Sequence, residues 1–212
     1  MIIQKVGIIG AGTMGNGIAQ ACAVVGIPVV MVDISEAAVA KGIATVSGSL
    51  DRLLKKEKIT EADKAAALSK IQGSTQYEDL MSADLVIEAA TENQDLKVKI
   101  LKQLDALLAP DVIIASNTSS ISITQLAAVT TRADRFIGMH FFNPSAHDGL
   151  GGNHSRFANQ RCNARCRACL GYKLGQNTHH CEECAWLCGQ SHLGAHDQRS
   201  VVCFVRRLGL AR

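Results

Sequence analysis

Short apolar runs alternate with longer stretches of helical spacing over the first 144 residues. The short runs have the length and character of strands buried on both faces of a parallel sheet, at residues 5–9, 28–33, 71–75, 83–88, 112–115 and 135–139. Helices are expected between them, at residues 13–25, 35–58, 60–70, 96–108 and 123–129. Gly26 is placed to end the first helix, and Ser35 to cap the second. Strands that alternate with helices predict an α/β fold, a doubly wound parallel sheet.

The composition changes at Pro144. Residues 1–144 contain 13 Lys+Arg and 15 Asp+Glu, whereas residues 145–212 contain 9 and 4. Seven of the eight cysteines and six of the seven histidines follow Pro144, and that part contains no Ile, Met or Pro. We therefore expect one domain over 1–144 and an atypical tail over 145–212.

The sequence shows no sign of membrane insertion or secretion. No apolar run approaches the roughly 18 residues of a membrane span, and Met1 leads into the first strand without a basic or long apolar segment. We expect a cytoplasmic protein that binds neither membrane nor nucleic acid.

A glycine-rich turn joins the first predicted strand to the first predicted helix. In Gly10-Ala-Gly-Thr-Met-Gly15, the first glycine permits a tight turn, the second lets a pyrophosphate approach, and the third allows close helix packing. Asp33 ends the second strand, where a carboxylate binds the adenosine ribose and repels a 2′-phosphate. This context predicts a Rossmann-type site that prefers NAD to NADP, with cofactor-binding residues Gly10, Gly12, Thr13, Met14, Gly15 and Asp33.

Two polar segments follow later strands, Ser116-Asn-Thr-Ser-Ser120 and His140-Phe-Phe-Asn143. Ligands bind beyond the carboxyl ends of parallel strands, so both segments should face the cofactor. His140 could take a proton from an alcohol as hydride leaves the same carbon, or could be a structural strand-end residue. Ser119 alone would be interpreted as a helix N-cap.

Lysines cluster near the end of the second predicted helix, at residues 55, 56 and 58. Cations near a helix C-terminus usually form a solvated face. A site for an anionic carrier such as coenzyme A is the alternative.

Four motifs in order resemble one family: Val6-Gly-Ile-Ile-Gly-Ala-Gly-Thr-Met-Gly15, Glu88-Ala-Ala-Thr-Glu92-Asn93, Ser116-Asn-Thr-Ser-Ser120 and His140-Phe-Phe-Asn-Pro144. They are similar to the 3-hydroxyacyl-CoA dehydrogenases, most closely the bacterial 3-hydroxybutyryl-CoA dehydrogenases. The resemblance implies NAD-dependent interconversion of a short-chain 3-hydroxyacyl-CoA and its 3-ketoacyl-CoA, as in fatty acid β-oxidation.

The resemblance also implies roles for individual residues. His140 would be the general base, and Ser119 would contact the substrate oxygen. The nicotinamide side would be lined by Glu92, Lys97, Ser119 and Asn143, with Asn117 beside them as a cofactor residue. Ser49 and Lys56 would touch coenzyme A, and no metal is implied.

The tail departs from the family pattern. The family continues with a glutamate that orients the histidine, then with a helical domain that completes the substrate site and the homodimer. Neither is evident after Pro144, so we expect little activity from the 212-residue chain.

The spacing of the tail cysteines offers a rival interpretation. Cys166-x-x-Cys169 and Cys181-x-x-Cys184 have the spacing of a four-thiolate zinc ribbon. On that interpretation the chain is an NAD-binding regulatory module. A further rival keeps the NAD site but acts on another 2- or 3-hydroxy acid. A role of Lys55 and Lys56 in binding a coenzyme A thioester would distinguish the acyl-CoA dehydrogenase from this rival.

The genetic code favours an out-of-frame tail. Possible codons read one base out of step from Ser145 permit Val-Pro-Met-Met-Ala-Leu-Val-Glu, which matches the family after Asn-Pro. Residues 182–192 likewise permit Lys-Asn-Ala-Pro-Gly-Phe-Val-Gly-Asn-Arg. We interpret 145–212 as the product of one extra nucleotide near codons 144 and 145, with accidental cysteine spacing.

Overall fold

A computed structural model describes residues 3–141 and 157–158. Asn143 and the four cysteines of the zinc interpretation lie outside the described residues.

The described elements alternate as the sequence predicts. The strands are β1 (Val6–Ile9), β2 (Val29–Val32), β3 (Ile71–Ser74), β4 (Leu85–Glu88), β5 (Ile113–Ser116), β6 (Phe136–Gly138), β7 (His140–Phe141) and β8 (Phe157–Ala158). The α-helices are α1 (Thr13–Val24), α2 (Glu36–Lys55), α3 (Glu61–Ser69), α4 (Gln94–Leu107) and α5 (Ile123–Ala128). Two 3₁₀ helices that the sequence did not predict are η1 (Tyr77–Leu80) and η2 (Ala133–Arg135).

Six strands form one parallel sheet in the order β3-β2-β1-β4-β5-β6. β1 lies in the middle and pairs with β2 on one side and β4 on the other, so the strand order reverses there. This confirms the predicted doubly wound sheet. In such sheets, ligands bind beyond the carboxyl ends of the strands at which the order reverses, which here are β1 and β4. β7 and β8 form a separate antiparallel pair.

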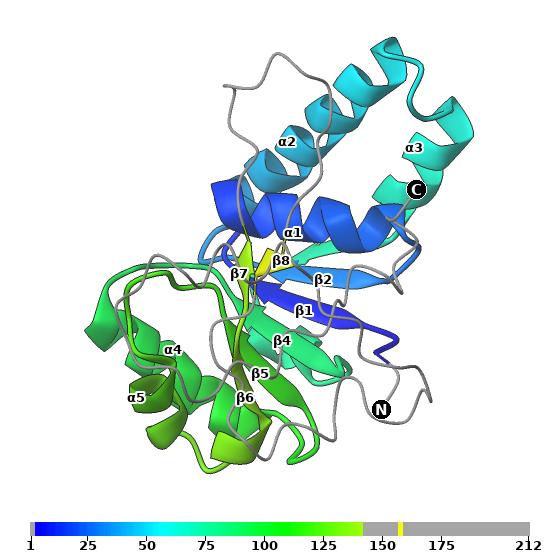
Figure 1. Cartoon of the computed structure of the whole chain (residues 1–212). Helices are drawn as coiled ribbons and strands as arrows, with labels where there is room; N and C mark the ends of the chain where they lie inside the picture. The colour runs from blue at the N-terminus through cyan, green and yellow to red at the C-terminus, as the bar shows by residue number, and fades with distance from the viewer. Residues whose placement is uncertain (1–2, 142–156, 159–212) are drawn as a thin grey trace, which may run out of the picture.

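Helices cover both faces of the sheet (Figure 1). One core lies between α1 and the sheet, with Ile18 and Cys22 packed on Ile8 and Ile87. The opposite core packs α4 and α5 on the other face. A smaller cluster joins α1, α2 and α3. The described residues therefore form three layers, with the apolar strands in the middle layer.

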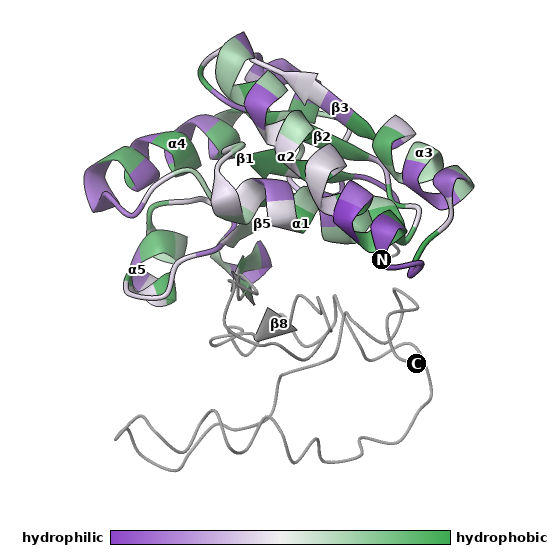
Figure 2. Ribbon diagram, turned by 90° about the horizontal axis from the view of Figure 1, so that it is seen from above, coloured by the Kyte–Doolittle hydropathy of each residue, from purple (hydrophilic) through white to green (hydrophobic). Residues whose placement is uncertain are grey.

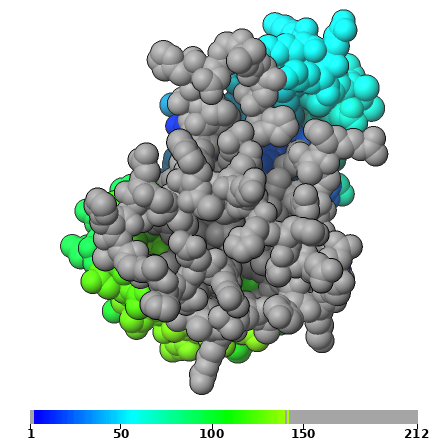
Figure 3. All heavy atoms as spheres, in the orientation of Figure 1, coloured from blue at the N-terminus to red at the C-terminus, as the bar shows by residue number. Residues whose placement is uncertain are grey.

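Hydropathy along the ribbon and residue number on the molecular surface show the same arrangement of helices and strands. In Figure 2 the central strands are green, whereas purple and green alternate along α3 and α4. Figure 3 shows the α2–α3 end in cyan, apart from the green α4–α5 side. Within the described residues, no helix is long and apolar enough to cross a membrane.

Helix ends follow local capping chemistry. The predicted cap Ser35 accepts a hydrogen bond from the Ala38 N–H at 3.2 Å, and α2 begins directly after it. Asn93 accepts from the Leu96 N–H at 2.9 Å, so α4 begins two residues earlier than predicted. Ser122 occupies the N-cap of α5, so the alternative interpretation of Ser119 as a helix cap does not hold.

Candidate functional site

The glycine-rich turn lies at the carboxyl end of β1, in the middle of the sheet. Gly10 has a φ of +98°, and a Cβ there would lie 2.7 Å from the Ala89 carbonyl oxygen. A Cβ on Gly15 would lie 1.7 Å from the Gly10 carbonyl oxygen, so α1 packs against the turn in a way only glycine allows. These two glycines are required by the fold itself.

Gly12 differs from its neighbours because nothing lies within 4 Å of a Cβ built on it. It is exposed and caps α1 without a side-chain hydrogen bond. The first-turn N–H groups of a helix have no partner within the helix, and here they belong to Thr13, Met14 and Gly15. An exposed helix N-terminus beside a glycine is suited to bind a pyrophosphate.

Asp33 follows β2 directly and is half-buried beside the turn. The Ala11 N–H donates to its Oδ2 at 2.6 Å, and the Ile34 N–H donates to its Oδ1 at 2.7 Å. Both bonds hold the carboxylate next to the glycine-rich turn. The residues present therefore fit the phosphate and ribose groups of a dinucleotide.

A buried polar cluster lies at the ends of β4 and β5. Glu88 and Ser116 face each other across the two strands, and Lys97 reaches them from α4. The Lys97 ammonium forms an ion pair with Glu88 and lies 3.3 Å from the Ser116 hydroxyl oxygen, which itself donates to Glu88 at 2.8 Å. All three side chains are fully buried. Lys97 is thus directed toward Glu88 in this structure.

The loops after β4 and β5 are joined by a second contact. The Thr118 hydroxyl donates to Glu92 at 2.7 Å, although Glu92 itself is exposed. Ser120 also lies within 3.5 Å of the same carboxylate oxygen. Ser119, between them, is exposed. Glu92 and Ser119 therefore lie at the carboxyl edge of the sheet, as the glycine-rich turn does.

The segment after β6 is attached to the end of β5. The Met139 N–H donates to the Ser116 carbonyl at 3.0 Å, and the Phe141 N–H donates to Asn117 Oδ1 at 2.9 Å. His140 lies between these two anchors, in β7. The backbone of the candidate base is thereby fixed at the same edge of the sheet.

Carboxylates at this edge influence the phenol of Tyr77, in η1. Burial raises the pKa of the Tyr77 phenol, and the charges of Glu88 and Asp33 raise it further. Cys22, on the buried face of α1, packs in the core, and burial raises the pKa of its thiol to about 12.

The two coenzyme A candidates lie apart from these loops. Ser49 is half-buried in the C-terminal part of α2, and exposed Lys56 follows the helix directly. The strand-end loops adjoin the opposite, N-terminal end of α2, which begins just after Asp33. In the part of the chain that the structure describes, no group of three His, Cys, Asp or Glu side chains could hold a metal.

Sequence reasoning missed Glu88, Thr118 and Gly42. Glu88 could have been found, because it is a charged residue at the end of the apolar run Leu85-Val-Ile-Glu88. Thr118 lies inside a motif whose neighbours were chosen. Gly42 carries no local signal, because its role depends on how α2 meets the turn: a Cβ there would lie 2.8 Å from the Ala11 carbonyl oxygen.

Comparison with known proteins finds a match to the family model "3-hydroxyacyl-CoA dehydrogenase, NAD binding domain" over residues 5–147. A 3-hydroxybutyryl-CoA dehydrogenase of Bradyrhizobium diazoefficiens is 51% identical over 143 residues, 68% of this chain and 49% of the relative. One from Clostridioides difficile is 45% identical over 141 residues, covering 66% and 50%. The chain thus spans about half the length of the curated relatives it matches.

A solved structure agrees with these sequence matches. The crystal structure of an (S)-3-hydroxybutyryl-CoA dehydrogenase from Ralstonia eutropha is 77% identical and superposes with a TM-score of 0.67. The match covers 68% of this chain and 50% of that one.

Proposed function

This chain belongs to the 3-hydroxyacyl-CoA dehydrogenase family, whose NAD-binding domain it contains, and we propose that it serves the reversible NAD-dependent oxidation of a short-chain 3-hydroxyacyl-CoA. The family membership confirms the resemblance carried by the four sequence motifs. The short acyl chain is supported by the two curated relatives, both named 3-hydroxybutyryl-CoA dehydrogenases.

The observation that carries the proposal is the position of the polar segments in the sheet. The glycine-rich turn follows β1, the Ser119 loop follows β5, and His140 follows β6. In the order β1-β4-β5-β6 these strands are parallel, so their carboxyl ends share one edge. A cofactor bound at the turn would extend across that edge toward Ser119 and His140.

Each residue then has a defined task. First-turn N–H groups of α1 bind the pyrophosphate, and Asp33 accepts hydrogen bonds from ribose hydroxyls. Glu92 and Asn143 line the nicotinamide side, and Lys97 supports that side through Glu88. When bound, NAD supplies the acceptor for the hydride on carbon 3. The Ser119 hydroxyl hydrogen-bonds the substrate oxygen, and His140 takes the hydroxyl proton as general base.

The test is binding followed by turnover. NADH fluorescence titration of the 212-residue chain should show saturable binding at the turn. Reduction of acetoacetyl-CoA, followed as loss of NADH absorbance, should be negligible in this chain and substantial in a protein whose tail is restored to the family frame. Absence of NADH binding, or of His140-dependent turnover in the restored protein, would contradict the proposal.

The preference for NAD over NADP rests on the charge of Asp33. The substitution Asp33→Asn keeps the shape and an acceptor but removes the charge that repels a 2′-phosphate. The ratio of NADP to NAD affinity should rise by about tenfold or more, as expected for loss of a close like-charge contact. An unchanged ratio of the two affinities would mean that the preference for NAD does not depend on the charge of Asp33. Asp111→Asn, at an exposed position just before β5, is a control for charge removal alone.

Coenzyme A recognition is assigned to Ser49 and Lys56. Lys56→Ala should weaken binding of coenzyme A and leave the affinity for NADH unchanged. Lys41→Ala is a matched control, because Lys41 is an exposed lysine of α2 nearer its other end. Equal losses of coenzyme A affinity in the two variants would mean that general surface charge, and not Lys56 itself, is responsible.

For the tail we retain the proposal that residues 145–212 are out of frame. The family match ends at residue 147, close to the break in composition, which supports it. Sequencing the DNA across codons 140 to 150, with the intact mass of the expressed protein, tests it. A frame confirmed as printed, together with one zinc ion per chain, would favour the NAD-binding regulatory module instead.

A further inference from the structure

We propose that Asn117 is a positioning residue for His140: its side-chain oxygen takes the place of a strand carbonyl and fixes the backbone that carries the base. The inference rests on the proposed function only in naming His140 as the base. It differs from the sequence prediction, which made Asn117 a cofactor contact.

The first step is the pair of anchors around His140. The donors are the N–H groups of the residues before and after it, Met139 and Phe141. The acceptors are also consecutive, the Ser116 carbonyl and Asn117 Oδ1, at 3.0 and 2.9 Å. A single residue held on both sides, by Ser116 at the end of β5 and by Asn117 directly after it, has little freedom to shift along or away from the sheet.

The second step explains why a side chain makes the second bond. The parallel ladder between β5 and β6 ends with Ser116 and Gly138. Asn117 is drawn toward β4 instead, because its own N–H donates to the Glu88 carbonyl at 2.8 Å. Oδ1 then supplies the acceptor that lets the His140 segment continue beyond the last ladder pair.

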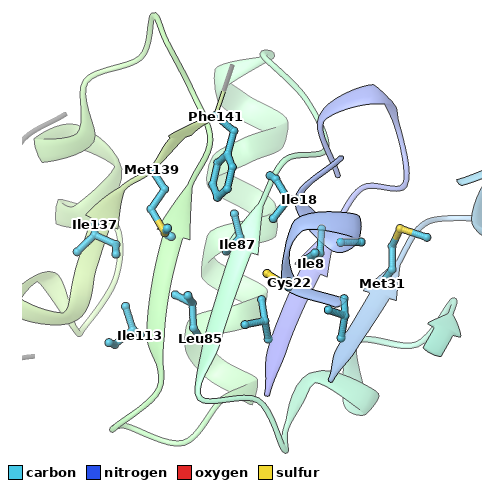
Figure 4. Close-up of a cluster of buried hydrophobic side chains, with 14 of the residues drawn as sticks. Ile8, Ile18, Cys22, Met31, Leu85, Ile87, Ile113, Ile137, Met139 and Phe141 are labelled. Atoms are coloured by element: carbon cyan, nitrogen blue, oxygen red, sulfur yellow. The ribbon is translucent and has the colours of Figure 1, made fainter. Parts of the chain in front are cut away.

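The third step concerns the surroundings of the bond. Asn117 is 7% exposed and Phe141 3% exposed, so water does not compete for the Phe141 N–H. Met139 and Phe141 point into the core beneath α1, beside Ile18 and Ile87 (Figure 4). Packing holds the side chains of Met139 and Phe141. The hydrogen bond from the Phe141 N–H to Asn117 fixes the path of the backbone between them.

The test compares two substitutions with a matched control. Asn117→Leu keeps the branched shape of the side chain and removes the acceptor, whereas Asn117→Asp keeps an acceptor for the Phe141 N–H. Asn93→Ala is the control, because Asn93 Oδ1 also accepts a backbone N–H at 2.9 Å but at the start of α4. All three are measured in the full 212-residue chain without added ligand, so the results do not depend on dehydrogenase activity.

Two readouts are needed, both by NMR. Amide exchange of Phe141 should be about tenfold faster in Asn117→Leu, the factor expected for one ordinary hydrogen bond. The imidazole resonance of His140, assigned with His140→Gln, should shift in the same variant. Asn117→Asp should restore both, and Asn93→Ala should change neither.

The outcomes separate the inference from its alternatives. Unchanged Phe141 exchange in Asn117→Leu would overturn it, as would faster exchange without any shift of the His140 resonance, which would make Asn117 structural only. If Asn117→Leu does not fold, Asn117→Ser, whose oxygen is one bond shorter, carries the same comparison. If the NMR results are as expected but the protein with the restored tail does not reduce acetoacetyl-CoA, the proposed function is contradicted and the inference about Asn117 is not.

Discussion

At the scale of single residues, Gly42 controls how closely α2 approaches the glycine-rich turn. A Cβ at this position would lie 2.8 Å from both the Cβ and the carbonyl oxygen of Ala11. Gly42→Ala should therefore push the turn from its place and raise the Kd for NAD by about tenfold, within the ordinary cost of overpacking. NADH titration measures the change.

Gly48 provides the control on the same helix. Nothing lies within 4 Å of a Cβ built there. Gly48→Ala should leave the NAD affinity unchanged and stabilise the fold by roughly 0.5–1 kcal/mol, because alanine favours helix over glycine. Similar weakening of NAD binding by both substitutions would mean that helix propensity, rather than contact with Ala11, is responsible.

The ion pair of Glu88 and Lys97 gives a second prediction at this scale. Glu88→Gln or Lys97→Met leaves one fully buried charge without its partner, and each should lower the free energy of unfolding by about 3–5 kcal/mol. The double variant removes both charges and should recover part of that loss. Urea unfolding of the four proteins measures the coupling. Additive losses would show that the pair does not act as a unit.

The structural role of a residue could be predicted where that role follows from the local sequence. Gly10 and Gly15 could be predicted because the turn and the helix that demand glycine are adjacent to them. Gly42 and the buried state of Glu88 could not, because both depend on a neighbour far along the chain, Ala11 for one and Lys97 for the other.

At the scale of elements, Arg132 joins the C-terminal end of α4 to the connection that leads into β6. Its guanidinium donates to Asp105 Oδ1 at 2.7 Å and to the carbonyls of Asp105 and Leu108 at 2.8 and 2.9 Å. The last carbonyls of a helix otherwise lack partners. Arg132 therefore stabilises the end of α4 and the approach to the His140 segment together.

This junction predicts a sensitivity to acid. Burial alone would raise the pKa of Asp105, but hydrogen bonds from the Thr131 N–H and from Arg132 outweigh it and lower the pKa. A carboxyl whose pKa falls on folding stabilises the protein above its unfolded pKa, about 3.9, and this contribution disappears as pH falls through the folded value. Asp105→Asn should be less stable than the parent protein at neutral pH.

Thermal unfolding at a series of pH values from neutral into the acid range tests this, because the contribution of Asp105 is lost only as the pH falls. The difference in Tm between Asp105→Asn and the parent protein should shrink as pH falls. A difference that stays constant would assign the loss to packing. Asp111→Asn, an exposed position after α4, controls for the change in charge.

The order and type of elements were predictable because each segment between 5 and 139 has its own periodicity. Boundaries shifted where a side chain outside the apolar pattern decides them, as Asn93 does for α4. β7 was not predicted because its pairing partner, β8, lies 16 residues or more away, beyond the apolar run.

At the scale of the whole molecule, NAD should stabilise the domain as one unit. The proposed contacts come from both halves of the sheet, so ligand binding would link them. With NAD at about a hundred times its Kd, the free energy of unfolding should rise by about 2.7 kcal/mol, which raises Tm by several degrees. Differential scanning fluorimetry with NAD and with NADP measures this, and equal shifts would contradict the assigned role of Asp33.

The central position of β1 has a consequence for synthesis of the chain. Of the six strands of the sheet, β1 leaves the ribosome first, and β2 and β3 can pair beside it while later residues are still being added. Its other edge, which receives β4, must wait until residue 88 has emerged. During that interval a nascent chain exposes an apolar strand edge next to the finished glycine-rich turn. We expect chaperone binding to concentrate in this window, and to end when β4 closes the sheet.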